Sequence, residues 1–600
     1  MSSMFYRSFF AVSVLALAVA GPGVSAQAEG PFVGWIELSD ELRQGPVPFA
    51  WVTEAEAGPS LSTVLGQMDH VAQSDDYLGL TIYLDQPALT FAQAGAIRGG
   101  IAKVREAGKK VLVFAETYDL LDLYLASSAD RVLLQKKGSV ELSGLAVEEM
   151  YLADTLGKLG VRADLVQIGK YKGADEQLVR TEPSPEWDEN INGLLDGLYA
   201  HLIETVSAGR GMTVQEFEGK MAETMAMTDE QVLAAGLIDG VAARSLYEPT
   251  GAAFGDDFTW DSNLGAGTGA AMPDNPFALF SMLFEPQKPR TRRATLAVVH
   301  AYGPITSGDS SLGDGFTSES TIGSATIERA LIDALEDENV KAVLLRIDSP
   351  GGSALASEMI WQAMREVAAD KPVFASVGSM AASGGYYLVC GAERVFVEPT
   401  SIVGSIGVVG GKFVMKGLYD WAGIRVTRRT RGPGGDLFNS VEPFDEQQRQ
   451  LVRRSMQVIY DQFRDRIRIG RGDRLTDLDA VDEGLLFTGA QAVENGMADD
   501  LGGLDAALAA LAQRVELEDG EYDVIDLPLP LSLPEYLNEV FGVASPRLQA
   551  AAPELAALRK LLGEARWRGA AALLDGMAQL RHEPVLLLHP SAVHVTTGGR

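Results

Sequence analysis

The stretch Val343-Leu-Leu-Arg-Ile-Asp-Ser-Pro-Gly-Gly352 joins an apolar run to a turn rich in glycine and proline. A continuous apolar run such as residues 342–347 is typical of a strand that is buried on both faces of a parallel sheet. The glycine pair would follow at the carboxyl end of that strand, where it could either turn the chain or aim N–H groups into a cleft. The stretch therefore predicts an α/β fold.

The apolar part of this stretch has a counterpart 263 residues earlier, Leu80-Thr-Ile-Tyr-Leu-Asp85. Two more pairs keep that offset: Val33–Leu38 with Leu296–Ala301, and Ala129–Val132 with Ala392–Val395. Later pairs, at Gly209 with Gly470 and at Gly236 with Gly496, lie 261 and 260 residues apart, which small insertions explain. Solenoid repeats run about 20–50 residues, so this long period indicates a duplicated domain.

Each copy alternates between strand-like and helix-like segments. In the second copy we expect strands at 295–300, 342–347 and 373–377, with helices at 326–335 and 358–368 between them. Long amphipathic helices are expected at 186–206 and 445–467, and a strand at 163–168. The apolar face of the helix at 326–335 would contain Ile327, Leu331, Ile332 and Leu335. That of the helix at 445–467 would contain Leu451, Met456, Ile459, Tyr460 and Phe463. This alternation predicts stacked βαβ units.

The domain organisation follows from the repeat. Residues 31–250 would form the first repeat domain, 251–293 a linker rich in Gly, Ala, Asp and Pro, and 294–515 the second repeat domain. Within the linker, the apolar residues 277–284 are expected to pack against a partner or their own domain. Residues 516–600 would be a C-terminal extension, to which the sequence assigns no role.

Residues 1–26 resemble an export segment. Arg7 precedes an apolar run at 9–20, Gly21-Pro-Gly23 breaks it, and Val24-Ser-Ala26 resembles a small-x-small cleavage site. The run is short beside the roughly 20 residues that a membrane span needs. It is therefore either a cleaved signal peptide or an uncleaved anchor, and both place the body outside the cytoplasm.

Composition excludes several classes of protein. The chain has 600 residues, 46% of them apolar, which supports real cores and excludes a disordered chain. Its net charge of −32 argues against nucleic acid as a partner, because that partner requires a basic surface. The six histidines form no ligand motif, and Cys390, the only cysteine, reads as a small core residue. We expect no metal and no cofactor.

A candidate nucleophile lies in the small-residue turn Ala381-Ala-Ser-Gly-Gly385, directly after a predicted strand. Glycines allow a sharp strand-to-helix turn and let a substrate carbonyl approach the hydroxyl of Ser383. An ordinary helix N-cap serine is the alternative. The first repeat has Leu120-Leu-Asp122 at this position, and Asp85-Gln-Pro-Ala-Leu89 where the second has Asp348-Ser-Pro-Gly-Gly352. Structural need alone therefore does not account for the serine or for Gly351 and Gly352.

A serine nucleophile needs a proton acceptor, and none of the histidines lies in a comparable turn. A lysine can serve if burial lowers its pKa from about 10.4 towards neutrality. Lys170 and Lys172 lie in Gly169-Lys-Tyr-Lys-Gly173, just after a predicted strand. The second repeat has Arg431-Gly-Pro-Gly-Gly435 here, without a lysine. We therefore expect one site assembled from both repeats, with the base from the first and the nucleophile from the second.

Together these motifs resemble the signal peptide peptidase A family in its long, duplicated bacterial form. The matching stretches are Asp348–Gly352, Ala381–Tyr386, Ser401-Ile-Val-Gly-Ser-Ile-Gly407 and Gly169–Ala174, and the resemblance covers roughly residues 31–515. It implies an α/β protein of two tandem ClpP/crotonase-like domains, made of repeated ββα-type units, with a C-terminal extension.

The resemblance also implies a function and its residues. Ser383 would be the nucleophile and Lys172, rather than Lys170, the base of a Ser/Lys dyad that cleaves residual signal peptides. It further implies a bowl-shaped homotetramer at the periplasmic face of the bacterial inner membrane. Two features depart from the family pattern: the N-terminal apolar run is shorter than a family anchor, and the tail after about residue 515 extends past the repeat.

The expected mechanism is peptide hydrolysis through an acyl-enzyme. Lys172 would take the proton of Ser383, which attacks the peptide carbonyl, and N–H groups near Gly351, Gly352 and Gly384 would stabilise the oxyanion. Substrates would be apolar peptides. Two alternatives stay open: a crotonase-like acyl-CoA enzyme, disfavoured by the export segment, and an inactive scaffold of the same fold.

Overall fold

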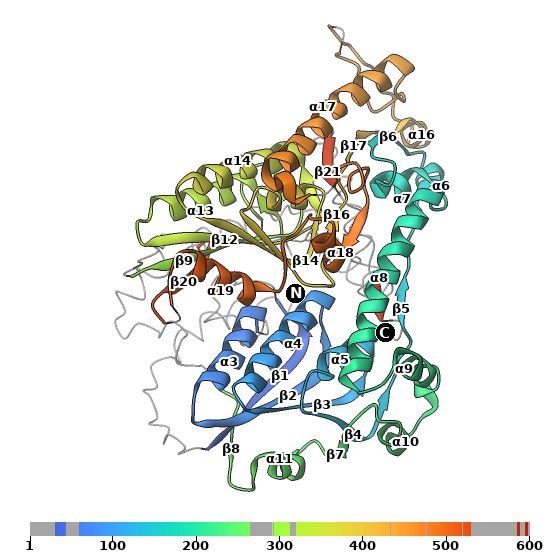
Figure 1. Cartoon of the computed structure of the whole chain (residues 1–600). Coiled ribbons are helices and arrows are strands. Elements are labelled where there is room, and N and C mark those ends of the chain that lie inside the picture. Colours follow the sequence, from blue (N-terminus) through green and yellow to red (C-terminus); the bar gives the residue numbers. More distant parts are fainter. Residues whose placement is uncertain are drawn as a thin grey trace, which may run out of the picture.

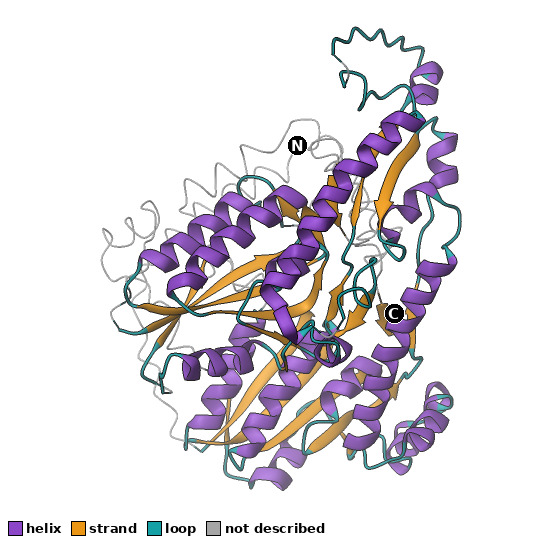
Figure 2. Ribbon diagram, turned by 45° about the horizontal axis from the view of Figure 1, so that its top comes forward, coloured by secondary structure: helices purple, strands orange, loops and turns teal. Residues whose placement is uncertain are grey.

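The computed structural model describes residues 31–43, 59–264, 291, 293–311, 320–432, 434–475, 477–518, 520–529, 585–588 and 595–597. Figure 1 shows two α/β units, with the first-repeat strands β1–β4 in one and β9, β12 and β14 of the second repeat in the other. In both units the strands form a layer that is covered by helices (Figure 2). No helix in these ranges is long and apolar enough to cross a membrane.

The first repeat is built on a six-stranded parallel sheet in the order β7-β4-β3-β2-β1-β8. Its strands are β1 (Phe32–Glu41), β2 (Tyr77–Ala88), β3 (Lys110–Tyr118), β4 (Arg131–Val140), β7 (Gly240–Ala242) and β8 (Thr259–Asp261). The connecting helices are α3 (Leu61–Gln73), α4 (Phe91–Glu106) and α5 (Leu120–Ala126). Parallel strands need such crossover helices, so this part of the chain consists of βαβ units.

The second repeat forms a mostly parallel sheet in the order β18-β16-β14-β12-β9-β20, with β15 beside β14. Its strands are β9 (Thr295–Tyr302), β12 (Val340–Ser349), β14 (Val373–Ala382), β15 (Arg394–Val397), β16 (Ile402–Gly404), β18 (Leu486–Thr488), β19 (Asp500–Leu501) and β20 (Asp523–Leu527). The helices between them are α13 (Ser324–Glu336), α14 (Ala354–Asp370) and α15 (Gly384–Val389). The expected strands and helices of this copy are therefore present.

The duplication holds in three dimensions. β1, α3, β2, α4 and β3 begin 263 residues before β9, α13, β12, α14 and β14, respectively. The long helices α8 (Pro185–Gly209) and α17 (Glu446–Arg471) correspond with an offset of 261. In α8, Trp187, Ile191, Leu194 and Leu198 pack with Leu486 of β18, so the first repeat's long helix contacts the second repeat. The tandem α/β fold is confirmed.

A further sheet joins the two repeats. Its order is β11-β10-β13-β21-β17-β6, from β10 (Ile305–Thr306), β11 (Ile322–Gly323), β13 (Gly351–Ser353), β21 (Val585–Leu588), β17 (Val408–Val414) and β6 (Arg162–Ile168). β6 comes from the first repeat and pairs antiparallel with β17 of the second. Beside it, β5 (Leu145–Val147) pairs with β22 (Val595–Thr597).

Shorter helices complete the two units. They are α6 (Ala153–Lys158), η1 (Gly173–Asp175), α7 (Glu176–Val179), α9 (Val214–Met221), η2 (Thr224–Ala226), α10 (Asp229–Ala234), α11 (Tyr247–Phe254), α16 (Lys416–Trp421), η3 (Gly472–Arg474), α18 (Gly489–Glu494) and α19 (Leu504–Arg514).

Several elements refine the expected domain limits. β8 lies within residues 251–293, expected as a linker, and pairs with β1. β20, β21 and β22 lie within the expected extension 516–600, and all three pair with strands of the repeats. Residues 1–26 and 277–284, for which an export segment and a packed linker were expected, lie outside the described residues.

Two expected core positions are wrong. Ile332 is 43% exposed and Leu451 is 45% exposed, whereas α13 buries Ala330 and Ala334, and α17 buries Val452. Each helix buries other positions of its apolar stripe, because apolar character alone does not tell which side of a wide stripe is covered.

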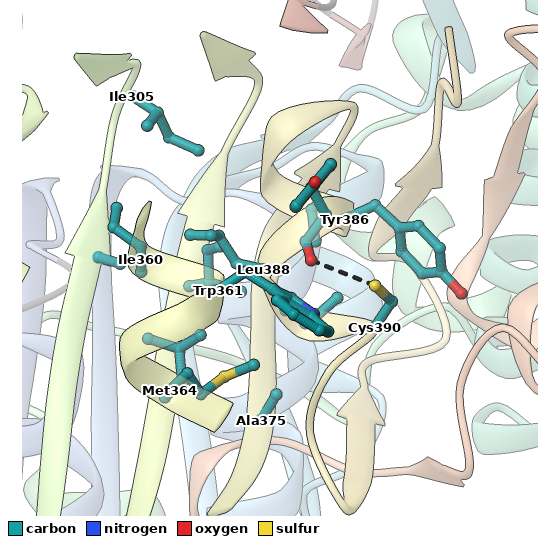
Figure 3. Close-up of a cluster of buried hydrophobic side chains, with 14 of the residues drawn as sticks. Ile305, Ile360, Trp361, Met364, Ala375, Tyr386, Leu388 and Cys390 are labelled. Carbon is teal, nitrogen blue, oxygen red and sulfur yellow. Dashed lines mark hydrogen bonds between the residues drawn. The ribbon is translucent and has the colours of Figure 1, made fainter. Parts of the chain in front are cut away.

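Cys390 is a core residue, as expected. Its side chain is fully buried, and its thiol donates to the Tyr387 carbonyl at 3.2 Å. Figure 3 shows it among Trp361, Met364 and Tyr386, between α14 and α15. Burial raises the pKa of this thiol to about 12, so it remains protonated and inert.

Candidate active site

Ser383 stands at a strained junction between β14 and α15. Its backbone has φ +53° and ψ −113°, a conformation that non-glycine residues rarely adopt. Its N–H donates to the Gly404 carbonyl at 2.7 Å. In the first repeat the equivalent helix α5 instead begins after Asp119, an ordinary extended N-cap residue with φ −90°. The sharp turn is therefore specific to the copy that has the serine.

Sheet register brings a second serine beside Ser383. β14 pairs with β16 so that Ala382 is opposite Gly404, and Ser405 follows directly. Ser405 has φ +53° and is 2% exposed, and its N–H donates to the Leu485 carbonyl at 2.6 Å. The two hydroxyls thus follow the ends of neighbouring strands.

The pairing of β6 with β17 brings in Lys172 from the first repeat. Ile168, the last residue of β6, is opposite Val408, so the turn at 169–172 lies next to residues 405–407. The Lys172 Nζ lies 2.7 Å from the Ser383 Oγ, 2.7 Å from the Ser405 carbonyl oxygen and 2.9 Å from the Ser405 Oγ. Residues 211 positions apart therefore share one hydrogen-bonded cluster.

A short turn at Glu483 and Gly484 holds the lysine loop in place. The Tyr171 N–H donates to the Glu483 carbonyl at 2.6 Å, and the Lys170 N–H donates to its carboxylate at 2.8 Å. On the other side, the Gly484 N–H donates to the Ile406 carbonyl at 2.9 Å. This turn thus ties the loop of the first repeat to the strand junction of the second.

Glycine is required at two positions around Lys172 because the chains approach so closely. A Cβ on Gly407 would lie 3.1 Å from Lys172 Cγ and 2.6 Å from the Ile168 carbonyl oxygen. A Cβ on Gly484 would collide with the backbone of Lys172. The lysine stem is therefore held tightly along most of its length.

Burial sets the protonation of this cluster. Ser383 is 0% exposed and Lys172 is 1% exposed. Loss of hydration disfavours the ammonium, so burial lowers the pKa of Lys172 well below its usual value. A neutral amine has two N–H donors and one lone pair. The Ser405 carbonyl and hydroxyl can accept the two hydrogens, which leaves the lone pair facing the Ser383 hydroxyl.

Lys170 is placed differently. Its side chain is 56% exposed, and its Nζ lies 3.9 Å from the Glu186 carboxylate. The Nζ also lies 4.8 Å above the ring of Tyr171. Contact with Tyr171 and nearby carboxylates raises the pKa of Lys170. Of the two lysines in this motif, Lys172 is therefore the one whose pKa is lowered and whose amine lies next to a serine.

The three candidate oxyanion glycines lie together. A Cβ on Gly384 would be 3.2 Å from the Gly352 nitrogen and 3.2 Å from the Gly351 Cα. Gly384 is the first residue of α15, so its N–H has no acceptor within the helix. The Gly351 N–H already donates to the Ser349 Oγ at 3.1 Å. Of the three amides, that of Gly384 is therefore left without a partner inside its helix, and that of Gly352 lies beside it.

Asp348 and Ser349 hold the loop that contains Gly351 and Gly352, and neither forms a hydrogen bond with Lys172 in the structure. The partly buried Asp348 carboxylate accepts from the Ser379 and Met380 N–H groups at 2.9 and 3.1 Å, which ties β12 to β14. The Ser349 hydroxyl donates to the Gly303 carbonyl at 2.7 Å. The motif at 348–352 therefore fixes the glycine loop against two neighbouring strands.

No group of three or more His, Cys, Asp or Glu side chains in the described ranges could hold a metal ion. The described histidines bond elsewhere: His300 to Tyr302 and Asp526, and His201 to Tyr124. None of those described hydrogen-bonds to Ser383.

Sequence reasoning missed Ser405, Glu483 and Gly484. Ser405 lies in the quoted motif Ser401–Gly407, but that motif received no role. Comparison of the repeats would have found it, because the equivalent position 263 residues earlier is Leu142, which has no hydroxyl. Glu483 and Gly484 carry no such signal, because their contacts with the lysine loop are mostly made by backbone atoms, apart from the Glu483 carboxylate that accepts from the Lys170 N–H.

Comparison with known protein families gives matches in both repeats. The model of peptidase family S49 matches residues 103–245 and 365–518. The Clp protease model matches residues 318–403, which include β12 and β14.

Two curated relatives match most of the chain, and a third matches about a third of it. "Protease 4" of Haemophilus influenzae is 31% identical over 443 residues, which cover 72% of this chain and 68% of that protein. "Serine protease SPPA, chloroplastic" of Arabidopsis thaliana is 27% identical over 514 residues, 84% of this chain and 72% of that protein. "Putative signal peptide peptidase SppA" of Enterococcus faecium is 29% identical over 211 residues, 35% of this chain and 58% of that protein.

Proposed function

This chain belongs to peptidase family S49 and is a serine peptidase, and we propose that it cleaves peptide bonds with a dyad of Ser383 and Lys172. One observation carries the proposal. The Nζ of a fully buried lysine lies 2.7 Å from the hydroxyl of a serine held in a strained strand-to-helix turn. A neutral amine at hydrogen-bond distance is what a serine needs to become a nucleophile.

The proposed reaction runs in two halves. As the Ser383 Oγ attacks the peptide carbonyl carbon, its proton passes to the Lys172 Nζ, and a tetrahedral oxyanion forms. The oxyanion accepts hydrogen bonds from backbone N–H groups of the candidate glycines, with Gly384 and Gly352 as the proposed donors, because the Gly351 N–H already donates to Ser349. The C–N bond then breaks as Lys172 returns its proton to the leaving amine. Water, deprotonated by Lys172, hydrolyses the acyl-enzyme and regenerates Ser383.

Ser405 is the proposed positioning residue for the base. Its carbonyl oxygen and its hydroxyl both lie within 2.9 Å of the Lys172 Nζ. When Lys172 takes up the proton, these two acceptors stabilise the ammonium in a site with little water. Ser405 would therefore contribute most when charge develops in the transition state.

The proposed substrates are apolar peptides, including the signal peptides that remain after protein export. Near the dyad, strands β6 and β17 contribute Leu165 and Val409 to an apolar cluster that also contains Leu178. One relative is named a putative signal peptide peptidase, which supports this substrate class. We also propose a homotetramer at the periplasmic face of the inner membrane, with the first repeat supplying the base and the second the nucleophile. Light scattering and fractionation would test the assembly and its place.

The acyl-CoA alternative finds no support, because the chain belongs to a family of peptidases. An inactive scaffold is separated from a peptidase by labelling. A fluorophosphonate probe, which reacts with activated serines, should label the wild-type chain at Ser383, as read by peptide mass spectrometry. Ser383→Ala should abolish both labelling and hydrolysis of an apolar fluorogenic peptide while leaving the melting temperature unchanged. Wild-type activity in Ser383→Ala would remove this serine from the mechanism.

A further inference from the structure

A strand from the C-terminal tail is inserted into the sheet at the proposed site. β21 lies between β13 and β17 and pairs antiparallel with both. Gly351, Gly352 and Ser353 are opposite Leu588, Leu587 and Leu586, and Val409 is opposite Leu586 on the other side. Figure 1 shows β21 beside β17, far in sequence from either neighbour.

β13 contains two of the three candidate oxyanion glycines, Gly351 and Gly352. Gly352, opposite Leu587, has its nitrogen 3.2 Å from a Cβ position on Gly384. Peptides often bind proteins by adding a strand to an open sheet edge, where backbone hydrogen bonds hold the peptide extended. Without β21, both β13 and β17 would present open edges at the site. β21 therefore runs where an extended peptide substrate would lie.

One side chain of this segment fills an apolar pocket. Leu586 is 1% exposed and packs in a cluster with Leu165, Leu178 and Val409. Leu165 belongs to β6, and Leu178 to α7 just after Lys172. The pocket is thus built from the elements that carry the proposed base. A substrate side chain next to the cleaved bond would bind in this pocket, which would therefore select for its size and polarity.

The first repeat accepts the tail in the same manner. β22 pairs antiparallel with β5, and β5 begins 263 residues before the matching part of β17. Val409 of β17 is opposite Leu586, and its counterpart Ala146 is opposite Thr596. Each repeat thus takes one strand of the tail at the equivalent edge, and the second strand keeps the first close to the site.

We propose that residues 585–588 are a tethered pseudosubstrate, which holds the peptide-binding groove closed until a substrate displaces it. This inference rests on the proposed function, because it takes the corner of Ser383 and Gly352 as the reaction centre. In the closed state Ser383 and Lys172 are buried and β21 occupies the sheet position beside Gly352, so we expect a peptide to reach them only after β21 leaves. The apparent affinity for substrate is then the intrinsic affinity multiplied by the fraction of molecules in which the groove is open.

The test opens the groove by a single substitution in the full chain. Leu586→Asp places a charge in the apolar pocket, and Leu159→Asp, at a leucine that is 57% exposed on the end of α6, is the matched control. For Leu586→Asp we expect kcat/KM on a short apolar peptide, and the rate of fluorophosphonate labelling of Ser383, to rise by roughly tenfold or more. The control should equal wild type.

Hydrogen exchange read by mass spectrometry reports the strand independently of catalysis. Amides 585–588 should be protected in the wild-type chain and in Ser383→Ala, and should exchange freely in Leu586→Asp. A synthetic peptide of residues 582–592, added to Leu586→Asp, should inhibit competitively. If Leu586→Asp does not fold, Leu587→Pro, which removes an N–H donor from the strand, takes its place.

Three results would overturn the proposal. They are free exchange at 585–588 in the wild-type chain, unchanged labelling in a variant whose strand has been released, and lower activity in that variant, which would mean that β21 completes the site. Failure of the proposed function looks different: the exchange pattern would be as expected, but Ser383→Ala would keep its hydrolytic activity.

Discussion

Removing the Ser405 hydroxyl tests the geometry around the base most directly. In Ser405→Ala the Lys172 Nζ loses the acceptor at 2.9 Å and keeps the carbonyl at 2.7 Å. In the proposed mechanism Lys172 is charged in the transition state, and a hydrogen bond to a charged group contributes about 1.5–3 kcal/mol. At about 1.4 kcal/mol for each factor of ten, kcat/KM should fall roughly 10- to 150-fold.

The pH profile separates this role from a merely structural one. The lost acceptor stabilises the ammonium more than the neutral amine, so its removal should lower the pKa of Lys172 further. The acid limb of kcat/KM, measured with a fluorogenic apolar peptide, should therefore move to lower pH while the plateau falls. A structural defect would lower the plateau and leave the limb in place.

Two further variants serve as controls. Ser405→Gly relieves the positive φ but also lacks the hydroxyl, so it should share the defect of Ser405→Ala. Ser207→Ala removes another buried hydroxyl, bonded to the Ile203 carbonyl within α8, and should leave activity unchanged. Activity of Ser405→Ala within twofold of wild type, or an acid limb shifted to higher pH, would refute the reasoning.

The remaining predictions concern the dyad. Lys172→Ala should lose as much kcat/KM as Ser383→Ala, with the double variant little worse, because the two residues act as a unit. Lys170→Ala should lose much less, because the Lys170 side chain is exposed. A severe loss in Lys170→Ala together with a mild loss in Lys172→Ala would show that the base is misassigned. Activity should rise with pH as Lys172 deprotonates, through an apparent pKa well below its usual value, since only the neutral amine accepts a proton. Replacing the described histidines one at a time should leave that acid limb unmoved, and its loss in any one variant would indicate a histidine base; they are His70, His201 and His300.

Much of the fold could be read from local patterns. The offset of 263 residues predicted the duplication, and the elements of both copies begin at that spacing. The run at 342–347 predicted β12 because a strand buried on both faces must be apolar throughout. Ile332 and Leu451 were misplaced because apolar character does not tell which side of a wide stripe meets the sheet.

The site was only partly predictable. Ser383 and Lys172 were proposed because each is absent from the other repeat, a comparison that needs no coordinates, and the structure places their side chains 2.7 Å apart. The same comparison, applied to Leu142 and Ser405, would have found the second serine. Glu483 acts mainly through its backbone carbonyl and its place in a turn, so its residue type reveals little.

The sequence by itself determined the duplicated α/β fold and the types of residue that could perform the chemistry, because periodicity and turn composition are local properties. Only the tertiary structure decided that Lys172 meets Ser383, through the pairing of β6 with β17, and that Lys170 faces solvent. Burial, and with it the lowered pKa of the lysine, arises from atoms contributed by both repeats. The insertion of β21 between β13 and β17 is likewise a long-range pairing, which no local pattern in residues 516–600 indicated.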